Sequence, residues 1–135
     1  MKKGYKGAIE PLALENSNFR TVLYTAENCQ LVLMSLKPGE EIGLEVHRGG
    51  DQFFRFESGQ GRVVINGADY EVKGGDGVIV PAGAKHNVTN ISASEDLKLY
   101  TIYSPPHHRD GVIHETKADA VADKEHFGGR TTEQD

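Results

Sequence analysis

Residues 39–59 read GEEIGLEVHRGGDQFFRFESG, and residues 75–90 read GDGVIVPAGAKHNVTN. Together these stretches offer four metal-ligand side chains, namely Glu45, His47, Gln52 and His86. Side chains two residues apart on a strand point to the same face, so Glu45 and His47 are predicted to face one cavity. Glycine and proline residues before Gln52 and before His86 allow the turns that would bring all four side chains together.

Short apolar runs alternate with turn residues along most of the chain, which is typical of an antiparallel sandwich or barrel. The predicted strands are Phe19–Thr25, Gln30–Leu36, Gln52–Glu57, Arg62–Ile65, Asp69–Val72, Gly77–Val80, Asn87–Asn90 and Leu97–Tyr103. The dipeptide Asn66-Gly67 predicts a tight hairpin. Alternation along the third strand puts Phe54 and Phe56 on the face of Gln52, as an apolar wall below the proposed metal.

The two stretches resemble the motifs of the cupin superfamily, G-x5-H-x-H-x3-4-E-x6-G and G-x5-P-x-G-x2-H-x3-N. All fixed positions of the second motif match, and these are Gly75, Pro81, Gly83, His86 and Asn90. The first motif departs at two positions, because Glu45 replaces the first histidine and Gln52 replaces the glutamate. The resemblance implies an all-β fold, the cupin-type double-stranded β-helix or jelly-roll barrel. It would occupy residues 1–115, and residues 116–135 would form a polar C-terminal helix or tail.

A metal would explain a carboxylate at position 45, since a buried and isolated carboxylate loses its hydration at a large cost. Nitrogen and oxygen donors suit one divalent transition metal, such as Zn, Mn, Fe, Co or Ni. The alternative is a protein that has lost its metal and keeps His47 and His86 as hydrogen-bonded cavity residues.

Three functions are compatible with this site. The first is a metal-dependent isomerase or epimerase of a small sugar or sugar acid, because the zinc-dependent mannose-6-phosphate isomerases are cupins with the same four ligand types. The second is a non-haem iron dioxygenase, since two histidines and one carboxylate are its minimum ligand set. The third is a sugar-binding module without turnover.

Other polar residues carry weaker hypotheses. Tyr100 or Tyr103 is a candidate proton donor, and alternation does not decide which of them faces the cavity. Lys85 is a candidate for binding an anion, although alternation directs it outward. A peripheral metal site is also considered, formed by His107, His108, His114 and Asp110, and an exposed loop is the favoured interpretation of that segment.

The composition limits the choice of partners. The chain of 135 residues carries a net charge of -5, and without clustered Lys and Arg it is not expected to bind nucleic acid. It has no apolar run long enough to span a membrane and no secretory signal, so a cytoplasmic location is expected. The single cysteine, Cys29, is expected in the core. A homodimer is expected, in which Gly7–Asn18 adds a strand to the partner and covers a sheet edge. In the C-terminal segment, residues 117–126 are expected to form a short helix and residues 130–135 to be disordered.

Overall fold

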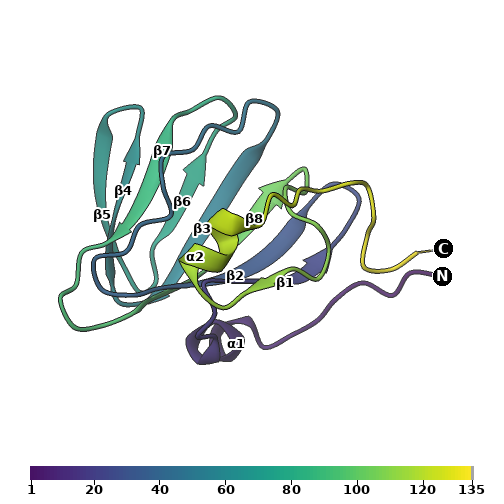
Figure 1. Ribbon diagram of the computed structural model, residues 1–135, viewed down its shortest axis with the longest axis horizontal. Helices are drawn as coiled ribbons and strands as arrows, with labels where there is room; N and C mark the ends of the chain where they lie inside the picture. The colour runs from purple at the N-terminus through teal and green to yellow at the C-terminus, as the bar shows by residue number, and fades with distance from the viewer. Residues whose placement is uncertain (135) are drawn as a thin grey trace.

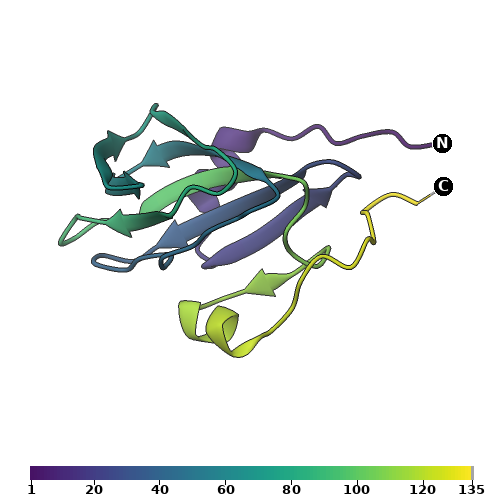
Figure 2. The ribbon, with the colours of Figure 1, turned by 90° about the horizontal axis from the view of Figure 1, so that it is seen from above.

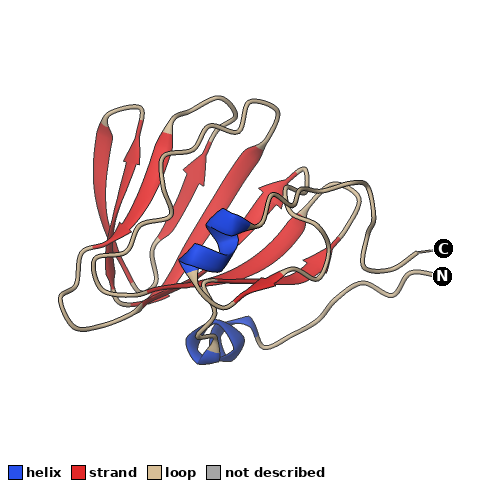
Figure 3. Cartoon of the chain, viewed as in Figure 1, coloured by secondary structure: helices blue, strands red, loops and turns tan. Residues whose placement is uncertain are grey.

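The structure is a computed structural model that describes residues 1–134. Its strands form two antiparallel sheets, one in the order β6-β3-β8-β2-β1-β9 and the other in the order β5-β4-β7 (Figure 1). The strands are β1 (Arg20–Thr25), β2 (Gln30–Leu36), β3 (Asp51–Ser58), β4 (Gln60–Ile65), β5 (Ala68–Lys73), β6 (Gly77–Val80), β7 (His86–Asn90), β8 (Leu97–Ser104) and β9 (Ile113–His114). The helices are α1 (Ile9–Glu15) and α2 (Lys117–Ala122). Figure 3 shows how strands dominate the fold, and this confirms the expected all-β class with a short C-terminal helix.

Apolar side chains from both sheets pack into one core, which includes Phe54 and Phe56 of β3, Val63 of β4 and Val88 of β7. Burial alternates along β3 and β8, so each strand turns one face inward. Gln52 lies on the inward face with Phe54 and Phe56, as predicted. The core thus lies below the level of Gln52 and supports the functional site from underneath.

The hairpin between β4 and β5 shows how local sequence sets the fold. Asn66 and Gly67 both have positive φ angles, of 46° and 82°, and they connect the paired residues Ile65 and Ala68. A two-residue turn with this geometry matches the twist of the flanking strands, and asparagine and glycine adopt it at low cost. The hairpin predicted from Asn66-Gly67 is confirmed.

The N-terminal segment is a helix, so the expectation that Gly7–Asn18 adds a strand is wrong. Its apolar residues Ile9, Leu12 and Ala13 follow helical spacing, and Ala13 is buried. Pro11 lies in the first turn, where its missing N–H leaves no helical hydrogen bond unmade. Figure 2 shows α1 and α2 on opposite sides of the six-stranded sheet. Neither helix among residues 1–134 is long and apolar enough to cross a membrane.

The C-terminal segment is bound to the rest of the molecule. The predicted helix is present as α2 but ends at Ala122 instead of residue 126, and Thr116 and Asp119 form a capping box at its start. Beyond it, Thr132 N donates to Thr25 O at 2.9 Å, and Glu133 accepts hydrogen bonds from the N–H groups of Lys3 and Gly4. These contacts differ from the disorder expected for 130–135, of which residue 135 lies outside the described part of the chain. Both termini therefore lie at one end of the molecule (Figures 1 and 2).

Cys29 is exposed, so its expected place in the core is wrong. It lies in the turn between β1 and β2, where Ala26 N donates to Cys29 O at 2.9 Å. The buried run of β2 begins only at Gln30.

Candidate metal centre

Glu45 and His47 lie on an extended segment between β2 and β3, rather than inside a strand as expected. Glu45 forms an isolated bridge with His86 of β7, with N···O distances of 2.9 and 3.0 Å. Gly83 N also donates to His47 O at 2.9 Å. The extended backbone turns both side chains the same way, and Glu45 Oε2 lies 3.7 Å from His47 Nε2. The spacing argument from the sequence therefore holds for this pair.

His107 completes a cluster that sequence reasoning did not assemble. Ligand atoms of Glu45, His47 and His107 all lie within 4.8 Å of one another, and the rings of His47 and His107 are 4.5 Å apart. His107 comes from the loop after β8, where Pro105 and Pro106 turn the chain back over the pocket. The sequence feature that could have pointed to His107 is its position four residues after Tyr103, the inward-facing residue at the end of β8. This cluster is the Glu/His/His site that the structure offers to a metal.

Gln52 and His86 approach the same region from the neighbouring strands. His47 lies 5.2 Å from His86 between ring centroids, and both Gln52 and His86 are only 2% exposed. Gln52 Nε2 donates to Thr101 Oγ1 at 3.0 Å, which leaves its carbonyl oxygen free. His86 Nδ1 lies 3.0 Å from Ala84 O, so Nδ1–H donates and Nε2 presents its lone pair. Both side chains are thus oriented with a ligand atom available.

Three buried ligand atoms have no hydrogen-bond partner among the described residues: His47 Nε2, Gln52 Oε1 and His86 Nε2. A buried acceptor without a partner costs on the order of 1–3 kcal/mol. A cation bound beside His47 would give this atom a partner, whereas His86 is not in the group of Glu45, His47 and His107 whose ligand atoms lie within 4.8 Å of one another. The donor set, which combines imidazole nitrogens, an amide oxygen and a carboxylate, fits a divalent transition metal.

The electrostatic environment favours the protonation states that bind metal. Burial lowers the pKa of His47 to about 4, and repulsion from His107 and His86 adds to this effect. Burial also lowers the pKa of His107. Both imidazoles are therefore neutral near pH 7, which is the form that ligates a metal. Burial raises the pKa of Glu45, so this carboxylate gains from a nearby cation.

The other members of the expected peripheral histidine site have separate partners. His108 Nδ1 lies 2.8 Å from Glu125 Oε2, and His114 Nε2 lies 3.0 Å from Asp123 Oδ2. Both histidines are 5% exposed, whereas an exposed loop was the favoured interpretation. That interpretation holds for His107, which is exposed, and fails for His108 and His114, because the tail after α2 covers them. Asp110 accepts a hydrogen bond from Thr132 instead.

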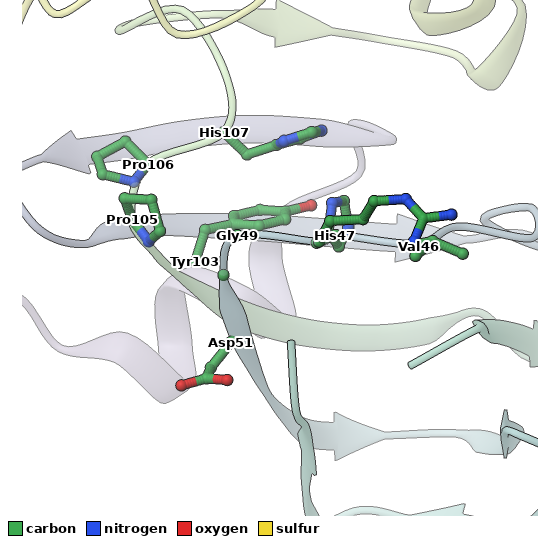
Figure 4. Close-up of a pocket in the computed structure, with 10 residues that line it drawn as sticks. Val46, His47, Gly49, Asp51, Tyr103, Pro105, Pro106 and His107 are labelled. Atoms are coloured by element: carbon green, nitrogen blue, oxygen red, sulfur yellow. The ribbon is translucent and has the colours of Figure 1, made fainter. Parts of the chain in front are cut away.

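A pocket of about 290 Å³ opens beside the cluster, and Tyr103, His47 and His107 lie in its wall (Figure 4). Tyr103 is 3% exposed on the inward face of β8, while Tyr100 lies on the opposite face and packs against Phe53. Alternation therefore selects Tyr103 once the register of β8 is known. Burial and the charge of Glu45 raise the pKa of Tyr103, so its phenol stays protonated.

Lys85, another sequence candidate, lies away from this pocket. Lys85 is exposed and lines a separate depression with Leu44 and Asn87. Asp51 lines the pocket, but it is exposed, accepts a hydrogen bond from Ala82 N and points away from the histidines in Figure 4. The position of Lys85 agrees with the outward direction expected from alternation.

A family model described as the cupin domain matches residues 32–103. The chain belongs to the cupin family. The match runs from β2 to the end of β8, so it contains Glu45, His47, Gln52 and His86 but ends before His107.

The similarity to two relatives extends beyond residues 32–103, the segment matched by the family model. Uncharacterized protein YrkC of Bacillus subtilis is 47% identical over 114 residues, which are 80% of this chain and 61% of YrkC. This cupin therefore spans less than two thirds of that relative's length. The crystal structure of BH2720 from Bacillus halodurans is 41% identical, with a TM-score of 0.87 over 90% of this chain and 96% of that one. An oxalate-binding protein of Thermotoga maritima is 30% identical over 69 residues, which are 51% of this chain and 56% of that protein.

Proposed function

We propose that this cupin binds one divalent transition metal and uses it to act on a small, oxygen-rich molecule. The observation that carries the proposal is the set of three buried ligand atoms without partners beside Glu45. The proposed ligands are Glu45, His47, Gln52 and His86, the set expected from the sequence, together with His107, which forms the close group with Glu45 and His47. The candidate metals are Zn, Mn, Fe, Co and Ni, which such nitrogen and oxygen donors suit.

The chemistry best supported by the pocket is isomerisation or epimerisation of a small sugar or sugar acid, as in the mannose-6-phosphate isomerase-like cupins. A bound metal would polarise adjacent carbonyl and hydroxyl oxygens. Tyr103 supports this function because its protonated phenol stands in the pocket wall, 5.7 Å from His47 between ring centroids. A pocket of about 290 Å³ suits a molecule of this size.

Two alternatives each have an observation in their favour. The set Glu45, His47 and His107 has two histidines and one carboxylate, the ligand set of non-haem iron dioxygenases. The likeness to an oxalate-binding protein favours a binding module for a small carboxylate without turnover.

Metal content tests the proposal first. Protein purified without added metal is analysed for elements as wild type, as the His47→Ala, His86→Ala double variant and as His107→Ala. Exposed His126 provides the matched control, His126→Ala. Near-stoichiometric metal in wild type and control, with loss in the site variants, is expected. Absence of metal in wild type, even after reconstitution with each of the five metals, would contradict the proposal.

Three assays then separate the candidate functions. Incorporation of solvent deuterium into a sugar acid indicates isomerase chemistry, and oxygen uptake with ferrous iron indicates a dioxygenase. Thermal stabilisation by oxalate without turnover indicates a binding module. The proposal also includes a cytoplasmic location and a homodimer, for which light scattering should give about twice the chain mass of 14.8 kDa.

A further inference from the structure

The loop after β8 that carries His107 is held on the sheet by a buried glutamine. Gln30 of β2 is fully buried and lies directly opposite Tyr103 of β8, which is opposite Gln52 of β3 on its other side. Gln30 is therefore level with the candidate metal centre. Its Oε1 accepts from the N–H groups of His107 and His108 at 3.1 and 2.9 Å, and its Nε2 donates to His108 O at 2.7 Å.

The chain after α2 holds the same loop through other groups. We refer to residues 123–127 as the strap. Glu125 Oε2 lies 2.8 Å from His108 Nδ1, its Oε1 accepts from Arg109 N at 2.6 Å, and the side chains of Glu125 and His108 are both buried. Hydrogen bonds to a carboxylate are stronger than those to a neutral amide, so the strap makes the stronger contacts with the loop.

His107 is anchored at both of its backbone polar groups, while its ring lies against the site. Its N–H is bound by Gln30, and its carbonyl accepts from Phe127 N of the strap at 3.0 Å. The ring stacks on Tyr103 with centroids 5.2 Å apart and lies 4.5 Å from the ring of His47 (Figure 4). The backbone of His107 cannot shift without breaking one of these bonds, so the ring is held in place before any metal binds.

We propose that Glu125 is a positioning residue for His107, so that the strap sets the metal affinity of this cupin. The inference deepens the proposed function and rests on it, because His107 is one of the proposed ligands. A ligand that is already in place loses little conformational freedom on binding, and release of the loop adds that loss to the cost. Residues 32–103, which the family model matches, contain neither Glu125 nor His107.

Cobalt binding tests the inference, because Co²⁺ is one of the candidate metals and its visible absorption reports on its ligands. Wild type, Glu125→Ala and the control Glu27→Ala, which truncates an exposed glutamate, are titrated under conditions where all three are folded. Glu125→Ala should bind Co²⁺ roughly 10-fold more weakly and with a changed spectrum, as is typical when support of a ligand is lost. The control should bind within about twofold of wild type. Unchanged affinity in Glu125→Ala would mean that Gln30 alone fixes the loop, and would overturn the inference.

A double-mutant cycle with His107→Ala separates positioning from a general weakening of the fold. Once His107 is absent, Glu125→Ala should have almost no further effect on Co²⁺ affinity, although it should still lower the free energy of unfolding. Equal weakening of Co²⁺ binding by Glu125→Ala with and without His107 would overturn the inference.

Metal-free protein separates this inference from the metal proposal. The ring protons of His107 should have shifted NMR resonances in wild type, because they lie beside the rings of Tyr103 and His47. Glu125→Ala should move them toward the values of an unstructured histidine, while the resonances of His86 on β7 stay unchanged. That result would support the positioning even if wild type binds no cobalt, which would contradict the metal proposal alone. Unmoved His107 resonances would overturn the inference.

A third measurement uses wild type alone and stays valid if Glu125→Ala does not fold. The amide of Phe127 belongs to the strap, whereas the amide of Thr132 bonds to Thr25 O beyond it. Coupling is reciprocal, so a metal whose affinity depends on the strap must also hold the strap in place. Loading with Zn²⁺ should slow hydrogen exchange at Phe127 by roughly 10-fold, and more than at Thr132. In zinc-loaded protein, no slowing at Phe127, or equal slowing at both amides, would overturn the inference.

Discussion

At the scale of single residues, two ring nitrogens with available lone pairs, on His47 and His86, explain why this cavity suits a metal. The sequence motifs identified both histidines with Glu45 and Gln52, because strand alternation and turn spacing are local properties. His107 could not be found in the same way, since its approach depends on how the loop after β8 returns over the pocket. Tyr103 could be chosen over Tyr100 as the residue facing the pocket once the register of β8 was known.

Tyr103→Phe tests whether the phenol takes part in chemistry. The variant removes one hydroxyl, whose hydrogen-bonded neighbour is His108 Nε2 at 3.3 Å, and keeps the ring in the pocket wall. We expect turnover of the proposed sugar-acid substrate to fall roughly 100-fold, which is typical for loss of an acid–base group, while metal content stays unchanged. Tyr100→Phe, on the opposite face of β8, is the control. Full activity of Tyr103→Phe would remove the phenol from the mechanism.

The buried histidines predict that the metal-free protein loses stability in mild acid. Burial lowers the pKa of His47 to about 4 and that of His108 to about 3, although Glu125 opposes the shift at His108. The folded state then binds fewer protons than the unfolded chain, whose histidines titrate near 6.5. Stability is therefore full above about pH 6.5 and falls as the pH drops below it, by roughly 2 kcal/mol for each histidine at pH 5.

Urea unfolding of EDTA-treated protein at several pH values measures this change. His108→Gln should flatten the dependence, because one of the two titrating groups is gone, and His126→Ala should leave it as in wild type. A free energy of unfolding that stays constant from pH 7.5 to pH 5 would contradict the pKa values given above.

At the scale of elements, the strands were predictable and the segments that cover them were not. The eight expected strands all occur, and most of their ends agree within one residue, because apolar alternation and turn residues mark them locally. β9 was not predicted, because a strand of two residues is too short to show a periodic pattern. α1 was expected as a strand, although Ile9, Leu12 and Ala13 have helical spacing. Asp123 and Glu125 lie in the stretch 117–126 that was expected to be helical, yet they follow the end of α2 and pair with buried histidines.

Glu125→Ala tests whether this tail is bound tightly. The side chain of Glu125 is 4% exposed, and it accepts from Arg109 N at 2.6 Å and pairs with His108 at 2.8 Å. Its loss leaves a buried imidazole N–H without a partner, so the free energy of unfolding should fall by about 1–3 kcal/mol. Glu27→Ala, in the exposed turn before β2, should change it by less than about 0.5 kcal/mol. Equal, small effects in both variants would mean that the tail contributes little stability.

At the scale of the whole molecule, the candidate site joins parts that are far apart in the sequence. Glu45 and His47 precede β3, His86 begins β7, and His107 follows β8. A metal bound to all of these residues would link both sheets and the C-terminal loop. Binding to the folded state alone must then stabilise the entire chain.

Metal binding should therefore raise the melting temperature. With free metal at about 100 times its dissociation constant, linkage adds about 2.7 kcal/mol, which corresponds to a rise of roughly 10 °C for a domain of this size. Thermal unfolding followed by circular dichroism, with and without added metal, measures the shift. The His47→Ala, His86→Ala double variant should show almost none of it, while His126→Ala should keep it in full. A comparable rise in the double variant would mean that the metal binds elsewhere, because only a site that includes these histidines links their loss to the stability of both sheets.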